Sequence, residues 1–429
     1  MGKKFSIAGP RGLALECVSK TVDGGLDAQA ALDVVLSSAD IDSRDRGFVT
    51  ELFYGYLRMR IRINRVLGCF LSRPEGLPVK IMQILGLASH EILHMDRVPA
   101  YASVDWGVDA AKAFSKGKLG GLANAVLRKV ARVSEDGLDE DFFKRNSHSE
   151  LEELSACYSC PEWIVDLWLK SYGRDTAHNY LKAQIKAPAA GFVLDVRDKN
   201  AASVADAVTN DSELIEGDGA GFAFPSGYRP ESFSDLPGHL CVRQSYAARQ
   251  ALASLDPLTW DTPVWDACAG RGGKSRYLVR SGIKNVLASD PHQGRLAMLD
   301  SELPDLAKFR ASAIAPPLAD ESLGTVLLDV PCSGLGGLSR RPDTKFKRSL
   351  EDTDSLVVLQ SKILDNCWKA VRKGGKLAYI TCTLNPDENE SQISKFIART
   401  PDAEVVNEWS TPEDSGLNEF LYSALLEKK

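Results

Sequence analysis

Apolar residues in the first third of the chain recur at i, i+3 and i+4, and strand-like alternation is rare. This spacing gathers apolar side chains on one face of a helix. Pro74, Pro78 and Pro99 fall between the periodic segments, as helix breakers do. The pattern therefore predicts an all-helical domain over residues 1–145. The helices expected within it cover residues 28–36, 46–70, 79–94, 103–114 and 119–133.

The pattern becomes irregular in the middle of the chain. Residues 134–154 are polar and acidic, which is typical of a linker or an exposed connection, and residues 161–181 are spaced like a pair of helices. Short β-like pieces at 191–196 and 221–224 then stand among many Gly, Asp and Ser residues. We predict a linker and a small α+β subdomain over residues 146–242.

From Pro263 onward, short apolar runs alternate with helical segments. Strands are expected at 264–267, 285–289, 325–328 and 377–380. Strand–helix alternation of this kind favours a doubly wound, parallel sheet. The fold class predicted for the whole chain is therefore an all-α domain followed by a small α+β subdomain and an α/β Rossmann-like domain over residues 243–429.

The net charge of −6 hides an asymmetry between the two ends of the chain. Residues 1–134 hold 19 Lys and Arg against 13 Asp and Glu, a net +6, so the remainder carries −12. A basic region beside an acidic one suggests that the first recruits a polyanion. The alternative is a chance imbalance on solvated helix faces.

The apolar runs and the cysteines indicate the cellular compartment in which the protein is expected. No stretch of 18 apolar residues is present, and no apolar segment follows the lysines of residues 1–10, so neither a membrane span nor a signal peptide is expected. Nine cysteines without a secretory signal then suggest a reducing, cytoplasmic setting. The pair Cys157 and Cys160 has no second pair and no nearby His, so we expect no metal.

The first candidate site is the glycine-rich run Asp-Ala-Cys-Ala-Gly-Arg-Gly-Gly-Lys at 266–274, between a strand and a helix. Glycines let the backbone turn sharply against a ligand, and the helix N-terminus offers free N–H groups. Asp290 ends the next strand, where a carboxylate can accept hydrogen bonds from ribose hydroxyls. The run suits NAD, S-adenosylmethionine or a purely structural turn, but it lacks the Gly-x-Gly-x-x-Gly spacing of NAD sites.

Two further motifs end the third and fourth predicted strands. Asp329-Val-Pro-Cys-Ser-Gly334 contains Cys332, and Thr381-Cys-Thr383 contains Cys382. Ligands bind at the carboxyl ends of strands in such sheets, so these side chains should face one cleft and suggest thiol chemistry. A lone cysteine is more often a small buried hydrophobe. We interpret four others in that way: Cys17, Cys69, Cys241 and Cys367.

Together these motifs resemble the Nop2/Sun family of RNA cytosine-5 methyltransferases. The matching texts are Cys-Ala-Gly-Arg-Gly-Gly-Lys-Ser, Asp-Val-Pro-Cys-Ser-Gly, and Thr-Cys-Thr followed by Glu-Asn-Glu. The N-terminal region is similar to a NusB-like RNA-binding domain at residues 51–58, 97–102 and 122–128. This pairing resembles the bacterial members of the family that act on small-subunit ribosomal RNA. The resemblance covers nearly the whole chain and is thinnest at 185–240.

The resemblance implies a role for each catalytic residue. Cys382 would be the nucleophile that adds to C6 of the cytosine, and Cys332 would assist release of the methylated product. Asp329 would act at N3 of the base. Lys274 is our candidate for the positive charge that lowers the pKa of the nucleophilic thiol.

The resemblance also implies S-adenosylmethionine as cofactor. Asp290 would hold the ribose of the cofactor, and Asp329 would also lie near the cofactor. Ser312 stands at the position where members of the family usually have an acid that contacts the adenine side. The loop expected to wrap it consists of Cys268, Ala269, Gly270, Arg271, Gly272, Gly273 and Lys274. The basic run 340–345 is expected to contact RNA phosphate, with a solvated loop as the alternative.

The expected partner is RNA, either 16S rRNA or a small-subunit precursor, bound by a monomer and not at a membrane. DNA enzymes use the Pro-Cys cysteine as nucleophile and have no second one, so the presence of both favours RNA over DNA. The chain departs from the family where Arg271 replaces a proline and Ser312 an acid, and around residues 242–247 and 417–420. These departures leave open an RNA-binding or ribosome-assembly protein that has lost catalysis.

Overall fold

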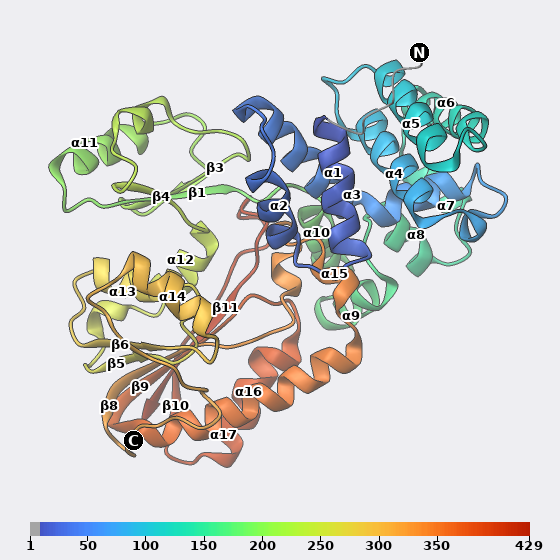
Figure 1. Ribbon diagram of the computed structural model, residues 1–429. Coiled ribbons are helices and arrows are strands. Elements are labelled where there is room, and N and C mark those ends of the chain that lie inside the picture. Colours follow the sequence, from blue (N-terminus) through green and yellow to red (C-terminus); the bar gives the residue numbers. More distant parts are fainter. Residues whose placement is uncertain (1–8) are drawn as a thin grey trace. The chain divides into compact units, whose positions relative to one another are not determined.

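The computed structural model describes residues 9–429, which form two compact units (Figure 1). The helical unit runs to residue 170 and also includes residues 341–347. The sheet unit holds residues 171–340 and 348–429. The expectation about the first ten residues falls mostly on residues 1–8, which lie outside the described part of the chain.

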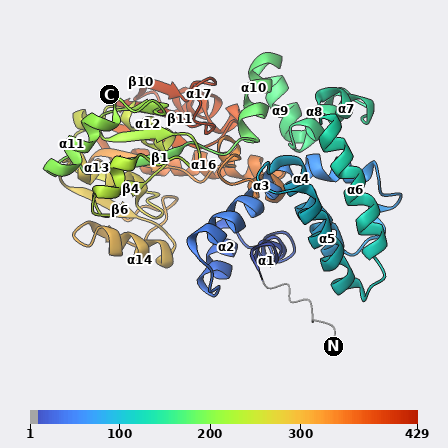
Figure 2. The ribbon, with the colours of Figure 1, turned by 90° about the horizontal axis from the view of Figure 1, so that it is seen from above.

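The helical unit contains the five predicted helices together with α1, whose Pro10 occupies the first turn. Its helices are α1 (Pro10–Val22), α2 (Ala28–Ser37), α3 (Ser43–Gly68), α4 (Val79–His94), α5 (Ala100–Ser115), α6 (Gly120–Asp136), α7 (Glu140–Arg145) and α8 (Glu150–Cys157). Helices α3 and α4 approach closely at Gly55, where a Cβ atom would lie 2.3 Å from His90 Nε2. The absence of a side chain on Gly55 permits this approach. Figure 2 shows α1 to α6 from above. The prediction of an all-helical first domain is confirmed.

Residues 134–154, expected to form a linker, instead contain α7 and α8. Phe143 is fully buried, and the guanidinium of Arg62 lies 4.5 Å from the centre of its ring. Ser149 caps α8 by accepting a hydrogen bond from the Glu152 backbone. One buried aromatic ring therefore anchors a segment whose composition indicated a solvated connection.

The short helix α15 (Thr344–Lys347) belongs to the helical unit although it lies far along the sequence. Lys345 is only 2% exposed, and its ammonium donates to the carbonyl of Arg58 at 2.7 Å and to that of Ser159. The Asp343 carboxylate accepts a hydrogen bond from the Ala28 backbone. The chain thus leaves the sheet unit just after the Cys332 loop, docks in the helical unit and returns.

A small antiparallel sheet follows the helix pair α9 (Glu162–Tyr172) and α10 (Arg174–Gln184). Its strands are β1 (Ala190–Leu194), β2 (Glu216–Gly217), β3 (Gly221–Phe224) and β4 (Cys241–Arg243), in the order β2-β3-β1-β4. Helix α11 (Lys199–Val208) packs on the face that carries Phe192 and Phe224. The predicted α+β subdomain is therefore present.

The large sheet has seven strands in the order β10-β11-β9-β8-β5-β6-β7. They are β5 (Val264–Asp266), β6 (Val286–Ser289), β7 (Ala307–Phe309), β8 (Leu323–Asp329), β9 (Val371–Thr381), β10 (Ala403–Ser410) and β11 (Tyr422–Lys428). Strand β11 runs antiparallel to both of its neighbours, β9 and β10. The other pairings in this sheet are parallel. The order reverses between β5 and β8, and in such sheets ligands bind at that point, beyond the carboxyl ends of the strands.

The four predicted strands are confirmed, whereas β7, β10 and β11 were not anticipated. Strand β10 lies at the sheet edge and is mostly exposed, so it shows no apolar alternation. Strand β11 is buried on both faces and contains Ala, Leu, Glu and Lys, which favour helices. Pairing with β9 and β10 overrides that propensity.

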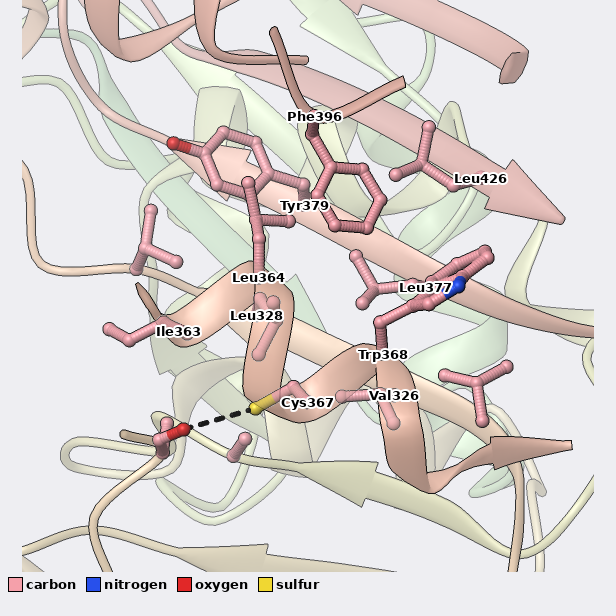
Figure 3. Close-up of a cluster of buried hydrophobic side chains, with 14 of the residues drawn as sticks. Val326, Leu328, Ile363, Leu364, Cys367, Trp368, Leu377, Tyr379, Phe396 and Leu426 are labelled. Atoms are coloured by element: carbon pink, nitrogen blue, oxygen red, sulfur yellow. Dashed lines mark hydrogen bonds between the residues drawn. The ribbon is translucent and has the colours of Figure 1, made fainter. Parts of the chain in front are cut away.

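Helices cover both faces of the large sheet (Figure 1). They are α12 (Tyr246–Ala253), α13 (Gly273–Arg280), α14 (Gln293–Glu302), α16 (Leu350–Ala370) and α17 (Glu390–Arg399). Figure 3 shows the core between β8, β9, α16 and α17, where Trp368 meets Phe396 edge to face at 5.5 Å. This packing holds the carboxyl ends of β8 and β9 side by side.

The interpretation of lone cysteines as buried hydrophobes is right for Cys17 and Cys367, which are fully buried. The thiol of Cys367 also contacts the carbonyl of Ala313 (Figure 3). The interpretation is wrong for Cys69, which caps the end of α3 and is exposed, and Cys241 is only partly buried. Separately, no helix within residues 9–429 is both long and apolar enough to cross a membrane.

The buried amine of Lys345 predicts a specific pH dependence of stability. Burial lowers its pKa from an ordinary 10.5 to about 7. Between these values the unfolded chain binds a proton that the folded chain does not, so this group makes stability rise with pH. We expect the melting temperature of the wild type, relative to Lys345→Met, to increase from pH 7.5 to 9.5. Lys118→Met, which alters an exposed side chain of the same unit, should show no such trend.

Candidate active site

The glycine-rich turn after β5 is held in a tight conformation. Gly270 and Gly272 have φ of 56° and 85°, and a Cβ on Gly272 would lie 2.2 Å from Leu299 Cδ1. Only glycine fits there without strain. The Asp290 carboxylate at the end of β6 accepts hydrogen bonds from the backbones of Gly270, at 3.1 Å, and His292, at 2.8 Å. Asp290 is therefore both a strand-end acid and the clamp of the turn.

Asp266 lies beneath this turn and is fully buried. Ser275 Oγ donates to its Oδ2 at 2.6 Å, while Oδ1 has no hydrogen-bond partner within residues 9–429. Burial raises the pKa of this carboxyl to about 7. We identified Asp266 in the sequence only as the start of a motif, and its buried, unpartnered oxygen makes it a further candidate for the ligand site.

Lys274 and Asp329 form an ion pair of 2.5 Å between Nζ and Oδ2. Burial by itself would lower the pKa of Lys274, but the Asp329 carboxylate and, more weakly, Cys382 raise it above its ordinary value. Lys274 therefore stays protonated and brings its charge to the edge of the sheet where Cys382 lies. The side chain of Asp329 is 39% exposed, so its carboxylate remains accessible from the cleft.

The two strand-end cysteines meet, as the sequence predicted. Their sulfur atoms are 3.4 Å apart, and the backbone N–H of Cys382 points at Cys332 Sγ, also at 3.4 Å. The hydrogen bond with Cys382, together with burial, raises the pKa of Cys332 well above its ordinary value. The two thiols share one hydrogen bond, in which either sulfur can be the donor.

A buried carboxylate, Glu388, joins the two cysteine loops, and sequence reasoning missed its role. Its oxygens accept five hydrogen bonds from both loops and from α16: Ser333 N, Ser333 Oγ, Gln360 Nε2, Thr383 Oγ1 and Asn385 Nδ2. The adjacent Asn389 accepts from Thr381 Oγ1 and donates to the carbonyl of Thr383. The Glu-Asn-Glu text was the only sequence signal for this clamp.

The remaining predicted residues occupy different places. Arg271 is exposed on the turn, and Ser312 Oγ, after β7, accepts from the Ile314 backbone. Cys268 and Ala269 line the buried side of the turn, and burial raises the pKa of Cys268 well above its usual value. Within residues 9–429, no three His, Cys, Asp or Glu side chains group as a metal site.

The expectation of phosphate contacts over 340–345 is wrong for Lys345, whose ammonium is buried against backbone carbonyls. Arg340 pairs with Glu419 at 2.6 Å and keeps partial exposure. Only Lys345 is withdrawn from the surface, because the chain turns into the helical unit within this run, while Arg340 and Arg341 stay exposed.

Comparison with known families shows what the chain is similar to. Residues 252–421 match the model for the 16S rRNA methyltransferase RsmB/F, and residues 10–132 match the model for the NusB family. The chain is thus similar to an RsmB/F methyltransferase in its sheet unit and to a NusB domain in its helical unit. It is 28% identical to the probable ribosomal RNA small subunit methyltransferase B of Bacillus subtilis, covering 94% of this chain and 90% of the relative. It is 28% identical to ribosomal RNA small subunit methyltransferase B of Vibrio cholerae, covering 97% and 96%.

Solved structures support the same fold. The crystal structure of PH0851 superposes with a TM-score of 0.75 at 21% identity, covering 99% of this chain and all of that one. A methyltransferase homologue from Pyrococcus horikoshii gives 0.53 at 19% identity over 66% of this chain and all of the other. The Rossmann-like fold is thus confirmed. The family models and the named relatives support an RNA methyltransferase, in agreement with the resemblance found in the sequence.

The Glu388 clamp gives a testable consequence. Glu388→Gln directs an N–H₂ group at donors and should cost about 2 kcal/mol of stability, because hydrogen bonds to a buried charge are lost. Methyl transfer should fall by more than tenfold while cofactor affinity changes little, since the clamp holds the cysteine loops. Thermal melts, calorimetry with cofactor and a methylation assay measure the three quantities.

The matched control is Asp387→Asn in the same turn, where the carboxylate is 63% exposed. It should leave all three quantities near the wild-type values. Equal losses in both variants would show that the turn, and not the clamp, matters.

Proposed function

We propose that the protein transfers a methyl group from S-adenosylmethionine to C5 of a cytosine in small-subunit ribosomal RNA, through a covalent bond between Cys382 and C6. The observation that carries this proposal is the thiol pair at 3.4 Å beside the Lys274–Asp329 ion pair. Carbon 5 of cytosine is too weak a nucleophile to take a methyl group unaided. A thiol at the site supplies the missing electron density.

Two features support Cys382 as the nucleophile. Cys332 retains its proton, so its S–H stabilises a thiolate on Cys382 by hydrogen bonding. The ammonium of Lys274 responds to the charge of Cys382, which means that it also stabilises that thiolate. In this proposal Cys332 keeps its proton while Cys382 reacts as the thiolate, as their distinct roles require.

The proposed reaction has an addition step and an elimination step. The Cys382 thiolate adds to C6 while a proton is held at N3 by Asp329, which gives an enamine nucleophilic at C5. After C5 accepts the methyl group, a base removes the C5 proton, the C6–S bond breaks and the thiolate of Cys382 returns. Cys332, in contact with the departing sulfur, assists this elimination. The target base must leave its stack to reach the thiols.

The residues of the turn fit S-adenosylmethionine, which supplies an electrophilic methyl group when bound. The unpartnered Oδ1 of Asp266 can accept a hydrogen bond from an amine, and Asp290 retains lone pairs for ribose hydroxyls. Gly270, Gly272 and Gly273 allow close approach of a ligand to the backbone, and Ser312 takes the adenine side. A related NSun6 from Pyrococcus horikoshii was solved with SFG, with a TM-score of 0.50 at 14% identity, covering 62% of this chain and 98% of that one.

The basic balance of residues 1–134 supports a polyanion as the partner. The presence of both Cys332 and Cys382 favours RNA over DNA, and we propose that the protein binds it as a monomer. The relatives' names point to small-subunit ribosomal RNA. The alternative of an RNA-binding protein without catalysis rested on Arg271 and Ser312. The retained glycine conformations and the thiol pair favour the enzyme.

The two cysteines should respond differently to replacement. Wild-type protein should transfer labelled methyl from S-adenosylmethionine into 5-methylcytosine of small-subunit rRNA that lacks native modification. Cys382→Ala should abolish both transfer and adduct, because no nucleophile remains. Cys332→Ala should accumulate a covalent protein–RNA adduct, because elimination is slowed. Scintillation counting and denaturing gels follow the two outcomes.

Cys367→Ala, which alters a buried core cysteine, serves as the control and should keep transfer without adduct. Adduct formation by Cys382→Ala but not by Cys332→Ala would reverse the assigned roles. RNA binding without label in any variant would favour the non-catalytic alternative.

A further inference from the structure

A cavity in the sheet unit has neither of the two thiols among its lining residues. It has a volume of about 130 Å³ and lies between the end of β1 and helices α12 and α13. Four arginines line it: Arg197, Arg249, Arg276 and Arg280. Asp195 is the one acid among the lining residues. Arginine forks of this kind match the oxygen atoms of phosphate groups.

Three of the four arginines are already neutralised. Arg197 pairs with Asp195 at 2.6 Å and Arg249 with Asp218 at 2.5 Å, while Nη1 of Arg276 contacts Glu302. No ion pair within residues 9–429 is formed by Arg280. The ion pairs therefore neutralise three of the four arginines, and the charge of Arg280 is left over in the cavity.

Two buried nitrogen atoms in this cavity have no hydrogen-bond partner in the described part of the chain: Arg276 Nε and Arg280 Nη1. The two residues are four apart on α13, so they lie on the same face of the helix. Burying a guanidinium N–H without an acceptor is costly, and an anion with several oxygen atoms would satisfy both donors. Burial lowers the pKa of Arg280. The Asp195 carboxylate acts against this shift, while Arg276 and Arg197 act with it.

The cavity is connected to the active site through α13. Lys274 stands in the first turn of this helix, and Arg280 ends it about 9 Å further along. Gln244, which lines the cavity, donates to the carbonyl of Gly273 at 3.2 Å. An RNA strand whose base enters the cleft beside Lys274 can therefore reach the cavity with its backbone.

We propose that Arg280 and Arg276 bind a backbone phosphate of the RNA substrate in this cavity, next to the flipped nucleotide. This inference rests on the proposed function, because it names a contact made by the same RNA. It assigns to the small sheet and α13 a substrate-holding role that is separate from the helical unit. The contact is electrostatic and independent of base sequence.

The test measures binding of unmodified small-subunit rRNA to the full-length protein at several salt concentrations. Arg280→Met keeps the packing of the aliphatic stem and removes the guanidinium. We expect about tenfold weaker binding, and a slope of log affinity against log salt that is smaller by about 0.7 to 0.9, the value for one phosphate contact. Arg280→Lys should keep the slope and lose part of the affinity, since the charge stays but the fork is lost.

The matched control is Arg372→Met, which removes the same charge from an exposed arginine of the sheet unit that pairs with Asp261. It should bind RNA with the wild-type affinity and slope. Wild-type affinity and slope for Arg280→Met would overturn the proposal, even if methylation proceeds normally. Weaker binding with an unchanged slope and a lower melting temperature would also overturn it, because Arg280 would then be structural.

Inorganic phosphate distinguishes the source of the anion. If millimolar phosphate raises the melting temperature of the wild type but not of Arg280→Met, and RNA binding is the same in both, the cavity holds a free anion and the RNA contact is refuted. Competition between phosphate and RNA in the wild type alone would support the contact. These binding measurements stand apart from methyl transfer, so failure of the proposed reaction would be seen separately.

Discussion

The parallel pairing of β8 with β9 is the constraint on which the site depends. In this pairing Asp329 lies opposite Ile380, so the residues that follow both strands emerge together at one edge of the sheet. Cys332 and Cys382 are fifty residues apart in sequence, yet their sulfur atoms come within 3.4 Å. The core of Trp368, Phe396 and their neighbours keeps this register, because a one-residue slip would move every side chain of the strand to the opposite face of the sheet.

A second constraint is the burial of charge at the site. Lys274 and Asp329 compensate each other, whereas Glu388 is compensated by neutral donors from both cysteine loops and α16. A buried carboxylate needs such donors, so the loops are held in position by the cost of leaving it unsatisfied. The same arrangement keeps the two sulfur atoms in hydrogen-bond contact, because Glu388 holds both loops that carry them.

Residues 341–347 show how a loop near the chemistry can belong to another unit. Asp343 and Lys345 make their hydrogen bonds inside the helical unit, and Arg60 stacks on Phe346 at 4.9 Å. The segment follows the Cys332 loop by only a few residues, so the chain itself links the helical unit to the cysteine loop. Removal of the helical unit would leave the ammonium of Lys345 without its carbonyl partners.

The sequence by itself determined the helical first domain, the four central strands and the strand-end residues Asp290, Asp329, Cys332 and Cys382. Local periodicity and turn chemistry decide these features, since parallel strands present their ends at one edge. Tertiary structure alone decided that Lys345 is buried, that residues 140–157 form helices and that β11 is a strand. It also decided that Glu388 clamps the thiols and that Arg276 and Arg280 share a cavity. These outcomes depend on partners distant in sequence, whose burial outweighs the local preferences of the residues themselves.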